Sequence, residues 1–369
     1  MLSLKPLVEL QVQRWLSEYI TALVWSPVGN RLAIASGAGE VVLWQDFQAT
    51  ILQAANGASI DALGFSGEGQ WLAAAGQSGK VMLWRLSSDL PELVETLTLG
   101  ATWIDRLRWH PHQPWLACNC GKAVHIWDAG QGEALAILEL PATVQDLGWS
   151  PDGTHLAVAA QQRVHIWETV RWISPRYEWE LMAVSRVLKW SPEGAYLASA
   201  NQDNSVGVLT WNKISALKQS PDTSADLPAV MGGFPGKIRQ LAWADVPDAE
   251  RSPILATATR NLVAMLILIP DEGWQSWLLD LHQDTVLDVA FQPQTGLLAS
   301  LSEDGLILLW QTAVEPIQVL EGVEDGFSCL AWHPTGEYLA AGGQQGEVLV
   351  WTLCPDARQR LFQQPEVLS

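Results

Sequence analysis

The chain has 369 residues, of which 48% are hydrophobic, and a formal net charge of −19. An acidic surface repels phosphate backbones and anionic lipid headgroups, so we expect neither nucleic acid nor membrane as a partner. No segment approaches the ~18 consecutive apolar residues of a membrane span, no signal peptide is evident, and four cysteines do not resemble a disulfide framework in a chain this long. These features favour the reducing cytoplasm.

The first predicted element is a strand over residues 7–13, where apolar and polar residues alternate. After it, one phrase returns eight times: a strand that ends in an aromatic residue, a turn, a small-residue strand, a Gly-containing turn and a strand that usually ends in Trp. The copy FSGEGQWLAAAGQSGKVMLW, which ends at Trp84, shows it clearly. A fixed period of about forty residues built from strands indicates a propeller-type repeat. The copies cover residues 15–44, 55–84, 98–127, 138–167, 180–211, 233–268, 281–310 and 322–351.

Two positions of the repeat give the number of blades. Six copies end in Trp, whereas the fifth and sixth place Leu209 and Ile267 there, with Trp211 expected on the same strand face as Leu209. The aromatic residue that ends the first strand also recurs eight times. With an outer strand from the variable stretch, each copy predicts one four-stranded antiparallel blade. Eight blades are favoured, and seven is the alternative if the degenerate sixth copy is misread.

We interpret residues 1–369 as a single propeller domain with a C-terminal tail over 352–369. The strand at 7–13 is expected to add the outer strand of the last blade, which closes the ring and protects the sheet edges. A second candidate for this position is the segment 359–364.

The seventh copy, LHQDTVLDVAFQPQTGLLASLSEDGLILLW, carries the clearest family signal. It resembles the WD-repeat β-propeller family, in the form of its prokaryotic stand-alone members, and the resemblance covers roughly Leu7 to Trp351. The resemblance implies an all-β, closed β-propeller and assigns a structural hydrogen-bond tetrad to His282, Ser300, Asp304 and Trp310. Only this copy has all four members, so the other blades must depend largely on apolar packing.

The positions where the first strand of each blade begins are candidates for partner binding. In the resembling family this neighbourhood surrounds the mouth of the central channel and often contacts partners. Acidic residues occur here in the second and third copies and basic residues in the fifth and sixth, and Arg and Trp are favoured interface anchors. The candidates are Tyr19, Trp103, Asp105, Arg186, Lys237 and Arg239. The alternative interpretation is that these are solvated surface charges.

A weaker candidate is a metal site in the segment HPHQPWLACNCGKAVHIW. Cys118, Cys120 and His110 are suitable ligand types, but their spacing matches no zinc signature. The cysteines also take positions that hold small residues in sister copies. We therefore predict no metal, and a structural role for these residues.

No catalytic pattern stands out. There is no nucleophile elbow, and the apparent triad of His282, Ser300 and Asp304 belongs to the tetrad. The sequence therefore predicts a non-enzymatic scaffold or adaptor without a cofactor or a small-molecule substrate, which docks a protein or peptide on its rim. The alternative is a metal- or redox-handling accessory protein that uses the Cys118/Cys120/His cluster.

Overall fold

The structure is a computed structural model that describes residues 6–86, 90–100, 102–216, 228–245, 252–311 and 316–357. The segment 359–364, predicted as the second candidate for the outer strand of the last blade, lies outside the described residues. The chain divides into two compact units, which are described separately. Unit 1 comprises Met1–Gly57 and Ala242–Ser369, and unit 2 comprises Ala58–Leu241.

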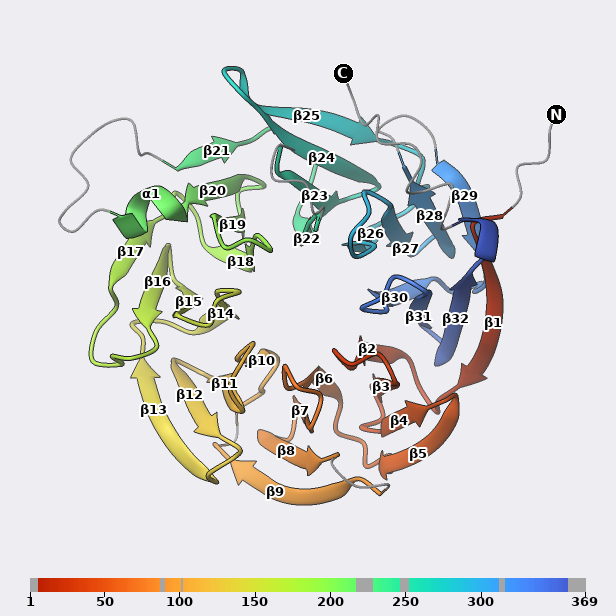
Figure 1. The fold of residues 1–369 in the computed structure, drawn as a ribbon, viewed down its shortest axis with the longest axis horizontal. Helices are drawn as coiled ribbons and strands as arrows, with labels where there is room; N and C mark the ends of the chain where they lie inside the picture. Colours follow the sequence, from red (N-terminus) through yellow and green to blue (C-terminus); the bar gives the residue numbers. More distant parts are fainter. Residues whose placement is uncertain are drawn as a thin grey trace. The chain divides into compact units, whose positions relative to one another are not determined.

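Unit 2 holds four complete antiparallel sheets, each with its strands side by side in chain order (Figure 1). A short helix, α1 (Trp211–Ala216), follows β20. The strands are β6 (Ile60–Phe65), β7 (Trp71–Gly76), β8 (Lys80–Arg85) and β9 (Glu92–Thr98); β10 (Leu107–Trp109), β11 (Trp115–Cys120), β12 (Ala123–Asp128) and β13 (Glu133–Glu139); β14 (Val144–Trp149), β15 (His155–Ala160), β16 (Arg163–Glu168) and β17 (Tyr177–Glu180); and β18 (Ser185–Trp190), β19 (Tyr196–Asn201), β20 (Val206–Thr210) and β21 (Ala229–Met231).

Unit 1 holds three complete sheets, and the boundary between the units falls inside β22, the first strand of a further sheet. The strands are β2 (Ile20–Trp25), β3 (Arg31–Ser36), β4 (Val41–Gln45) and β5 (Gln48–Gln53); β22 (Ile238–Trp243), β23 (Ile254–Thr259), β24 (Leu262–Ile269) and β25 (Gly273–Leu279); β26 (Val286–Phe291), β27 (Leu298–Ser302), β28 (Leu306–Trp310) and β29 (Pro316–Glu321); and β30 (Phe327–Trp332), β31 (Tyr338–Gly343) and β32 (Glu347–Leu353) with β1 (Val8–Trp15).

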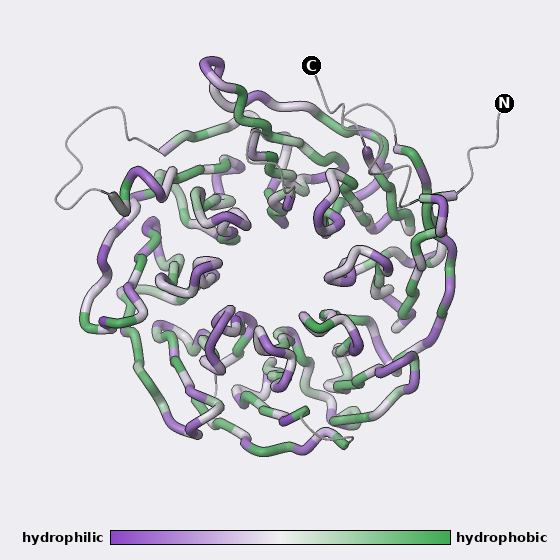
Figure 2. Tube along the Cα trace, viewed as in Figure 1, coloured by the Kyte–Doolittle hydropathy of each residue, from purple (hydrophilic) through white to green (hydrophobic). Residues whose placement is uncertain are grey.

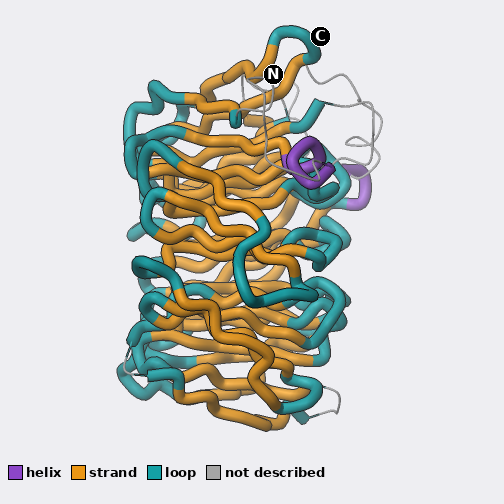
Figure 3. The backbone as a smooth tube through the Cα atoms, turned by 90° about the vertical axis from the view of Figure 1, so that its left-hand side faces the viewer, coloured by secondary structure: helices purple, strands orange, loops and turns teal. Residues whose placement is uncertain are grey.

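The described chain therefore forms eight four-stranded antiparallel blades of a β-propeller, with very little helix (Figure 3). The predicted fold class and the favoured count of eight blades are confirmed. The N-terminal strand β1 pairs antiparallel with β32, from Val8 opposite Leu353 to Trp15 opposite Glu347. It thus supplies the outer strand of the blade that contains the last repeat.

The second strand of each blade lies in the core because its small side chains let neighbouring sheets approach. In β7 every residue from Trp71 to Gly76 is buried, and Ala73 to Ala75 are fully buried. Figure 2 shows apolar residues, in green, along the strands and hydrophilic residues, in purple, at many of the turns. This distribution is the one that burial of apolar area requires.

Where the aromatic residue that ends a first strand is a tryptophan, its indole can also join neighbouring blades. In unit 2 the indole Nε1 of Trp109 donates to the carbonyl of Gly64 at 2.8 Å, and Trp149 donates to Arg108 at 3.0 Å. In unit 1 Trp332 donates to Ala290 at 3.1 Å. The acceptor is each time the residue just before the equivalent aromatic of the preceding blade. These bonds give many blades a polar link that does not depend on the tetrad.

The expectation that Trp211 continues a strand is wrong. Strand β20 ends at Thr210, and Trp211 begins helix α1. Its side chain is nevertheless buried, with its ring 5.7 Å from that of Trp190 and 4.9 Å from that of His155. The aromatic cluster around the indole accounts for its position better than strand periodicity does.

Candidate functional site

Unit 2 contains a cavity of about 760 Å³ at the beginnings of its first strands. The residues that line it come from the three blades that begin with β10, β14 and β18 and from the start of β22. They include five of the six candidate docking residues: Trp103, Asp105, Arg186, Lys237 and Arg239. The sixth, Tyr19, belongs to unit 1. Its ring lies against Gly37 and occupies the space that a Cβ atom at position 37 would need.

A bulge at the start of the first strand presents side chains to this cavity. The register of β14 against β15 shifts between Val144 and Asp146, and that of β18 against β19 shifts between Ser185 and Val187. The skipped residues are Gln145 and Arg186, which both line the cavity. Because a bulge leaves its extra residue unpaired and re-aims the side chain, the repeat itself places a variable residue here in successive blades.

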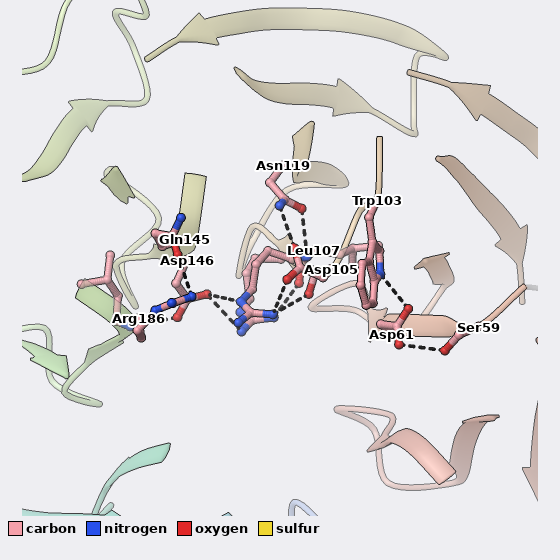
Figure 4. A network of polar contacts seen from close by, with 12 residues as sticks. Ser59, Asp61, Trp103, Asp105, Leu107, Asn119, Gln145, Asp146 and Arg186 are labelled. Carbon is pink, nitrogen blue, oxygen red and sulfur yellow. Dashed lines mark hydrogen bonds and ion pairs between the residues drawn. The ribbon is translucent and has the colours of Figure 1, made fainter. Parts of the chain in front are cut away.

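Trp103 is held at the edge of the cavity by an acidic residue of the preceding blade (Figure 4). Its indole Nε1 donates to Asp61 Oδ2 at 2.8 Å, while Ser59 Oγ donates to Asp61 Oδ1 at 2.8 Å. The ring remains 52% exposed. The hydrogen bond fixes the indole, so its apolar surface is presented without the entropic cost of ordering it on binding.

The carboxylate of Asp105 is engaged inside the protein. Asn119 Nδ2 donates to its Oδ1 at 2.8 Å, and Arg106 Nη1 donates to its Oδ2 at 3.2 Å. The Asn119 amide oxygen in turn accepts from the Arg106 backbone N–H at 2.9 Å. Asp105 therefore helps to order the cavity wall, with one hydrogen bond already accepted by each of its two oxygens.

Asp146 was not among the predicted site residues, although it organises the same wall (Figure 4). Its side chain is only 3% exposed, and its Oδ1 lies 3.3 Å from Arg106 Nε and 3.7 Å from Arg108 Nη2. These are ion-pair distances without hydrogen-bond geometry. Its Oδ2 accepts the backbone N–H of Leu188, in the next blade, at 2.8 Å. An acid at the same repeat position in the fourth and seventh copies, Asp146 and Asp288, is the sequence signal that could have indicated this role.

Asp288 repeats one of these contacts in unit 1, where its Oδ2 accepts the backbone N–H of Leu330 in the following blade at 3.1 Å. The two acids occupy equivalent positions on β14 and β26. An acid at this place therefore binds the next blade through a backbone amide.

The basic side of the cavity is composed of Arg186, Lys237 and Arg239, which we call the basic cluster. All three side chains are exposed. Arg186 Nη1 donates to Gln145 Oε1 at 3.1 Å. With the Gln202 amide turned so that its oxygen faces the guanidinium, that oxygen accepts from Arg186 Nη2 and Nε at 2.7 Å each. Lys237 and Arg239 have no side-chain partner within the described part of the chain.

The tetrad residues form a continuous chain of hydrogen bonds in the blade β26–β29. Trp310 Nε1 donates to Ser300 Oγ at 2.9 Å, and Ser300 Oγ lies 2.8 Å from His282 Nε2. His282 Nδ1 lies 3.0 Å from Asp304 Oδ2. Burial lowers the pKa of His282, which favours the neutral imidazole. A proton on Nδ1, which faces the Asp304 carboxylate, lets Nε2 accept from Ser300 Oγ. Since Ser300 is completely buried, it is not placed to attack a substrate.

The residues proposed as metal ligands have structural partners. His110 Nδ1 accepts the backbone N–H groups of His112 and Gln113, both at 3.0 Å, and its Nε2 lies 2.9 Å from the Gly153 carbonyl. Both ring nitrogens are therefore occupied. Burial raises the pKa of the Cys118 thiol to about 12, which keeps it protonated. Within the described ranges no three His, Cys, Asp or Glu side chains are grouped to hold a metal ion.

Cys120 is similarly engaged, with its Sγ 3.2 Å from the Leu99 carbonyl oxygen. All four cysteines are free thiols. Separately, no helix in the described residues has the length and apolar character to cross a membrane.

Comparison with known proteins identifies the repeat. The family described as WD domain, G-beta repeat matches residues 48–85, 92–128, 133–168, 274–311 and 314–352, together just over half of the chain. The chain is 28% identical over 173 residues to Protein SEC13 homolog of Drosophila melanogaster, covering 41% of this chain and 47% of that protein.

Two further relatives match over fewer aligned residues. Coronin-7 of Bos taurus is 31% identical over 166 residues, covering 43% of this chain and 16% of that protein. Probable cytosolic iron-sulfur protein assembly protein 1 of Kluyveromyces lactis is 30% identical over 116 residues, covering 28% of this chain and 35% of that protein. The matched region thus spans less than half the length of each relative. The repeats that match across the chain show that it belongs to the WD-repeat family.

Proposed function

We propose that this WD-repeat protein is a non-enzymatic scaffold that docks a protein partner at the cavity of unit 2. WD-repeat propellers generally serve as protein-interaction scaffolds, and this family membership gives the proposal its general form. The observation that carries it is the convergence on one cavity of an ordered, half-exposed Trp103 and exposed arginines. Trp and Arg are the residues most often found as energetic anchors of protein interfaces.

The way the cavity is built also supports docking. Two of its side chains are fixed by bonds between blades, Trp103 to Asp61 and Arg186 to Gln145. A preformed site loses little conformational entropy when a partner binds. One relative is named as a probable cytosolic iron-sulfur protein assembly protein. From the composition, we also propose that the protein is located in the cytoplasm. Cell fractionation would test this location.

Cross-linking of the tagged full-length protein, purified from its own cells, tests the proposal. Lys237 lines the cavity and has an exposed side chain, so an amine-reactive cross-linker would join it to a docked partner. Lys80, also exposed and in unit 2 but absent from the cavity lining, is the control. We expect a partner that cross-links to Lys237 and not to Lys80, and that is lost from the variant Trp103→Ala/Arg239→Glu.

Two results would contradict the proposal. Absence of a reproducible partner from a folded preparation, or retention of the partner by Trp103→Ala/Arg239→Glu with cross-links confined to other surfaces, would overturn docking at this cavity. Circular dichroism of the variant would show whether its fold is intact, so that a loss of the partner is not mistaken for unfolding.

A further inference from the structure

The acidic and basic side chains around the cavity differ in how far their charges are balanced. One acid and four bases line it: Asp105 with Arg106, Arg186, Lys237 and Arg239. Asp105 and the buried Asp146 both pair with Arg106. No carboxylate in the described residues pairs with any member of the basic cluster. The cavity thus carries uncompensated positive charge on one side.

The guanidinium of Arg186 is ordered by neutral groups only. Three of its five N–H bonds point to the amide oxygens of Gln145 and Gln202. Those contacts fix the plane of the guanidinium but leave its charge intact. Two N–H bonds, one on each terminal nitrogen, remain free for an acceptor. An ordered, uncompensated guanidinium of this kind fits a planar anion such as a carboxylate.

The local charge outweighs the net charge of the chain at this place. Although the protein carries −19 overall, exposed charges are screened beyond about 8 Å at physiological ionic strength. An approaching group therefore responds mainly to the basic cluster. Two of its members occupy equivalent repeat positions, Arg186 in the bulge of β18 and Arg239 on β22, with Lys237 two residues earlier. The repeat geometry is what brings these cations together.

The size of the cavity and the position of Trp103 indicate the kind of anion. A volume of about 760 Å³ exceeds the needs of a small inorganic ion. Trp103 offers an apolar face in the same lining, and its N–H is already used by Asp61. A ligand that satisfies both features has carboxylates for the basic cluster and an apolar side chain for the indole.

We propose that the ligand of this cavity is an acidic peptide segment of a partner protein. Its Asp or Glu carboxylates pair with Arg186, Lys237 and Arg239, and an apolar side chain packs on Trp103. This inference rests on the proposed docking function and specifies the chemistry of the partner.

Fluorescence anisotropy with the full chain tests the proposal. The probe is a short fluorescein-labelled peptide rich in Glu and containing Leu, and its control has Gln in place of every Glu. We expect the acidic probe to bind and the Gln probe to bind at least about tenfold more weakly, since several ion pairs are lost together. Raising NaCl from about 50 to about 500 mM should weaken only the acidic probe, because salt screens exposed ion pairs.

Variants assign the binding to the basic cluster. Each single change Arg186→Gln, Lys237→Gln or Arg239→Gln should weaken the acidic probe about two- to fivefold, as expected for exposed ion pairs, and the triple variant at least about tenfold. The matched control is the triple variant Arg14→Gln/Lys80→Gln/Arg171→Gln, which removes two exposed arginines and one exposed lysine outside the cavity. It should bind the acidic probe like the unaltered protein.

The outcomes separate this inference from the proposed function. If a cellular partner cross-links to Lys237 and needs Trp103 but is indifferent to the basic cluster and to salt, docking stands and the acidic-peptide inference is wrong. If a single-stranded oligonucleotide or inorganic phosphate displaces the probe at lower concentrations than the unlabelled acidic peptide does, the cavity selects phosphate and the inference is also wrong. If no cellular partner reaches the cavity, the proposed function fails, whatever the probe does.

Discussion

The tetrad of blade β26–β29 and the polar network around the cavity of unit 2 use similar side chains to different ends. In the tetrad, the Trp310 indole, the Ser300 hydroxyl and the His282 imidazole are buried and all bonded to one another or to Asp304. Around the cavity, Trp103 also donates its indole N–H to a side chain, the Asp61 carboxylate, but the residue is half exposed. The comparison shows that hydrogen bonds completed within the core stabilise a blade. The exposed side chains around the cavity, including the uncompensated cations of the basic cluster, are instead available for binding.

Removal of the two tryptophans should show the largest contrast. Trp310 is 1% exposed and packed in a core cluster, so Trp310→Ala should lower the free energy of unfolding by about 3–5 kcal/mol, through lost apolar contact and loss of the hydrogen bond to Ser300. Trp103→Ala should cost less than about 1 kcal/mol, since half of its surface is already in water. Urea unfolding monitored by circular dichroism measures both. Equal losses would contradict the division into core and binding tryptophans.

The second prediction concerns Asp146, which belongs to the cavity wall but is buried like a tetrad residue. Asp146→Ala should lower the free energy of unfolding by about 2 kcal/mol, because the Leu188 N–H loses its acceptor and Arg106 loses a carboxylate. The value is below that of a fully buried pair because the Arg106 and Arg108 side chains are 32% and 41% exposed. Asp146→Asn keeps an acceptor for Leu188 and should lose less; thermal or urea unfolding that ranks Asn below Ala would refute this account.

Acid should destabilise the protein through the tetrad. Burial lowers the folded-state pKa of His282, so below the ordinary value of 6.5 the unfolded chain binds a proton that the folded chain does not. Stability then falls as the pH drops from 6.5 through the folded pKa, by up to about 1.4 kcal/mol per pH unit for this residue. Burial opposes ionisation of Asp304, but hydrogen bonds from Gln283 and His282 lower its pKa overall, which adds a loss at more acidic pH.

Melting temperatures between pH 7.5 and 5 for the unaltered protein and for His282→Gln would measure this dependence. Burial also lowers the pKa values of His110, His125, His155 and His165, so the variant should show a shallower but not a flat profile. A profile with unchanged slope would mean that His282 does not titrate differently in the folded and unfolded states.

The smallest effect on stability is expected for the basic cluster. Arg186→Gln/Lys237→Gln/Arg239→Gln should change the free energy of unfolding by no more than about 0.5 kcal/mol, because these exposed cations form no ion pair in the described structure. The same variant should lose affinity for the acidic peptide. A large loss of stability without a loss of affinity would assign the cluster to the fold, and the contrast with the tetrad would disappear.

The repeat pattern explains how much of the fold and of the candidate site could be predicted from the sequence. The aromatic, small-residue and Trp positions gave the strands of all eight blades, including those with degenerate anchors, because the same apolar segments and turns return at the same places in every copy. The secondary structure at Trp211 was predicted wrongly, because a short helix buries its side chain as well as a strand would. The gathering of Asp105, Arg186 and Arg239 at one cavity followed from their equivalent positions in successive copies.

By itself the sequence determined the fold class, favoured eight blades over seven and indicated the places where variable side chains leave each first strand. Only the tertiary structure decided which charges are balanced: Asp105 by Arg106 and Asn119, Asp146 by arginines of the preceding blade, and the basic cluster by no carboxylate in the described residues. The physical reason is distance along the chain. Several of the decisive bonds join residues about one repeat apart, such as Leu188 to Asp146 across 42 positions and Arg186 to Gln145 across 41, and their geometry depends on how blades pack against one another.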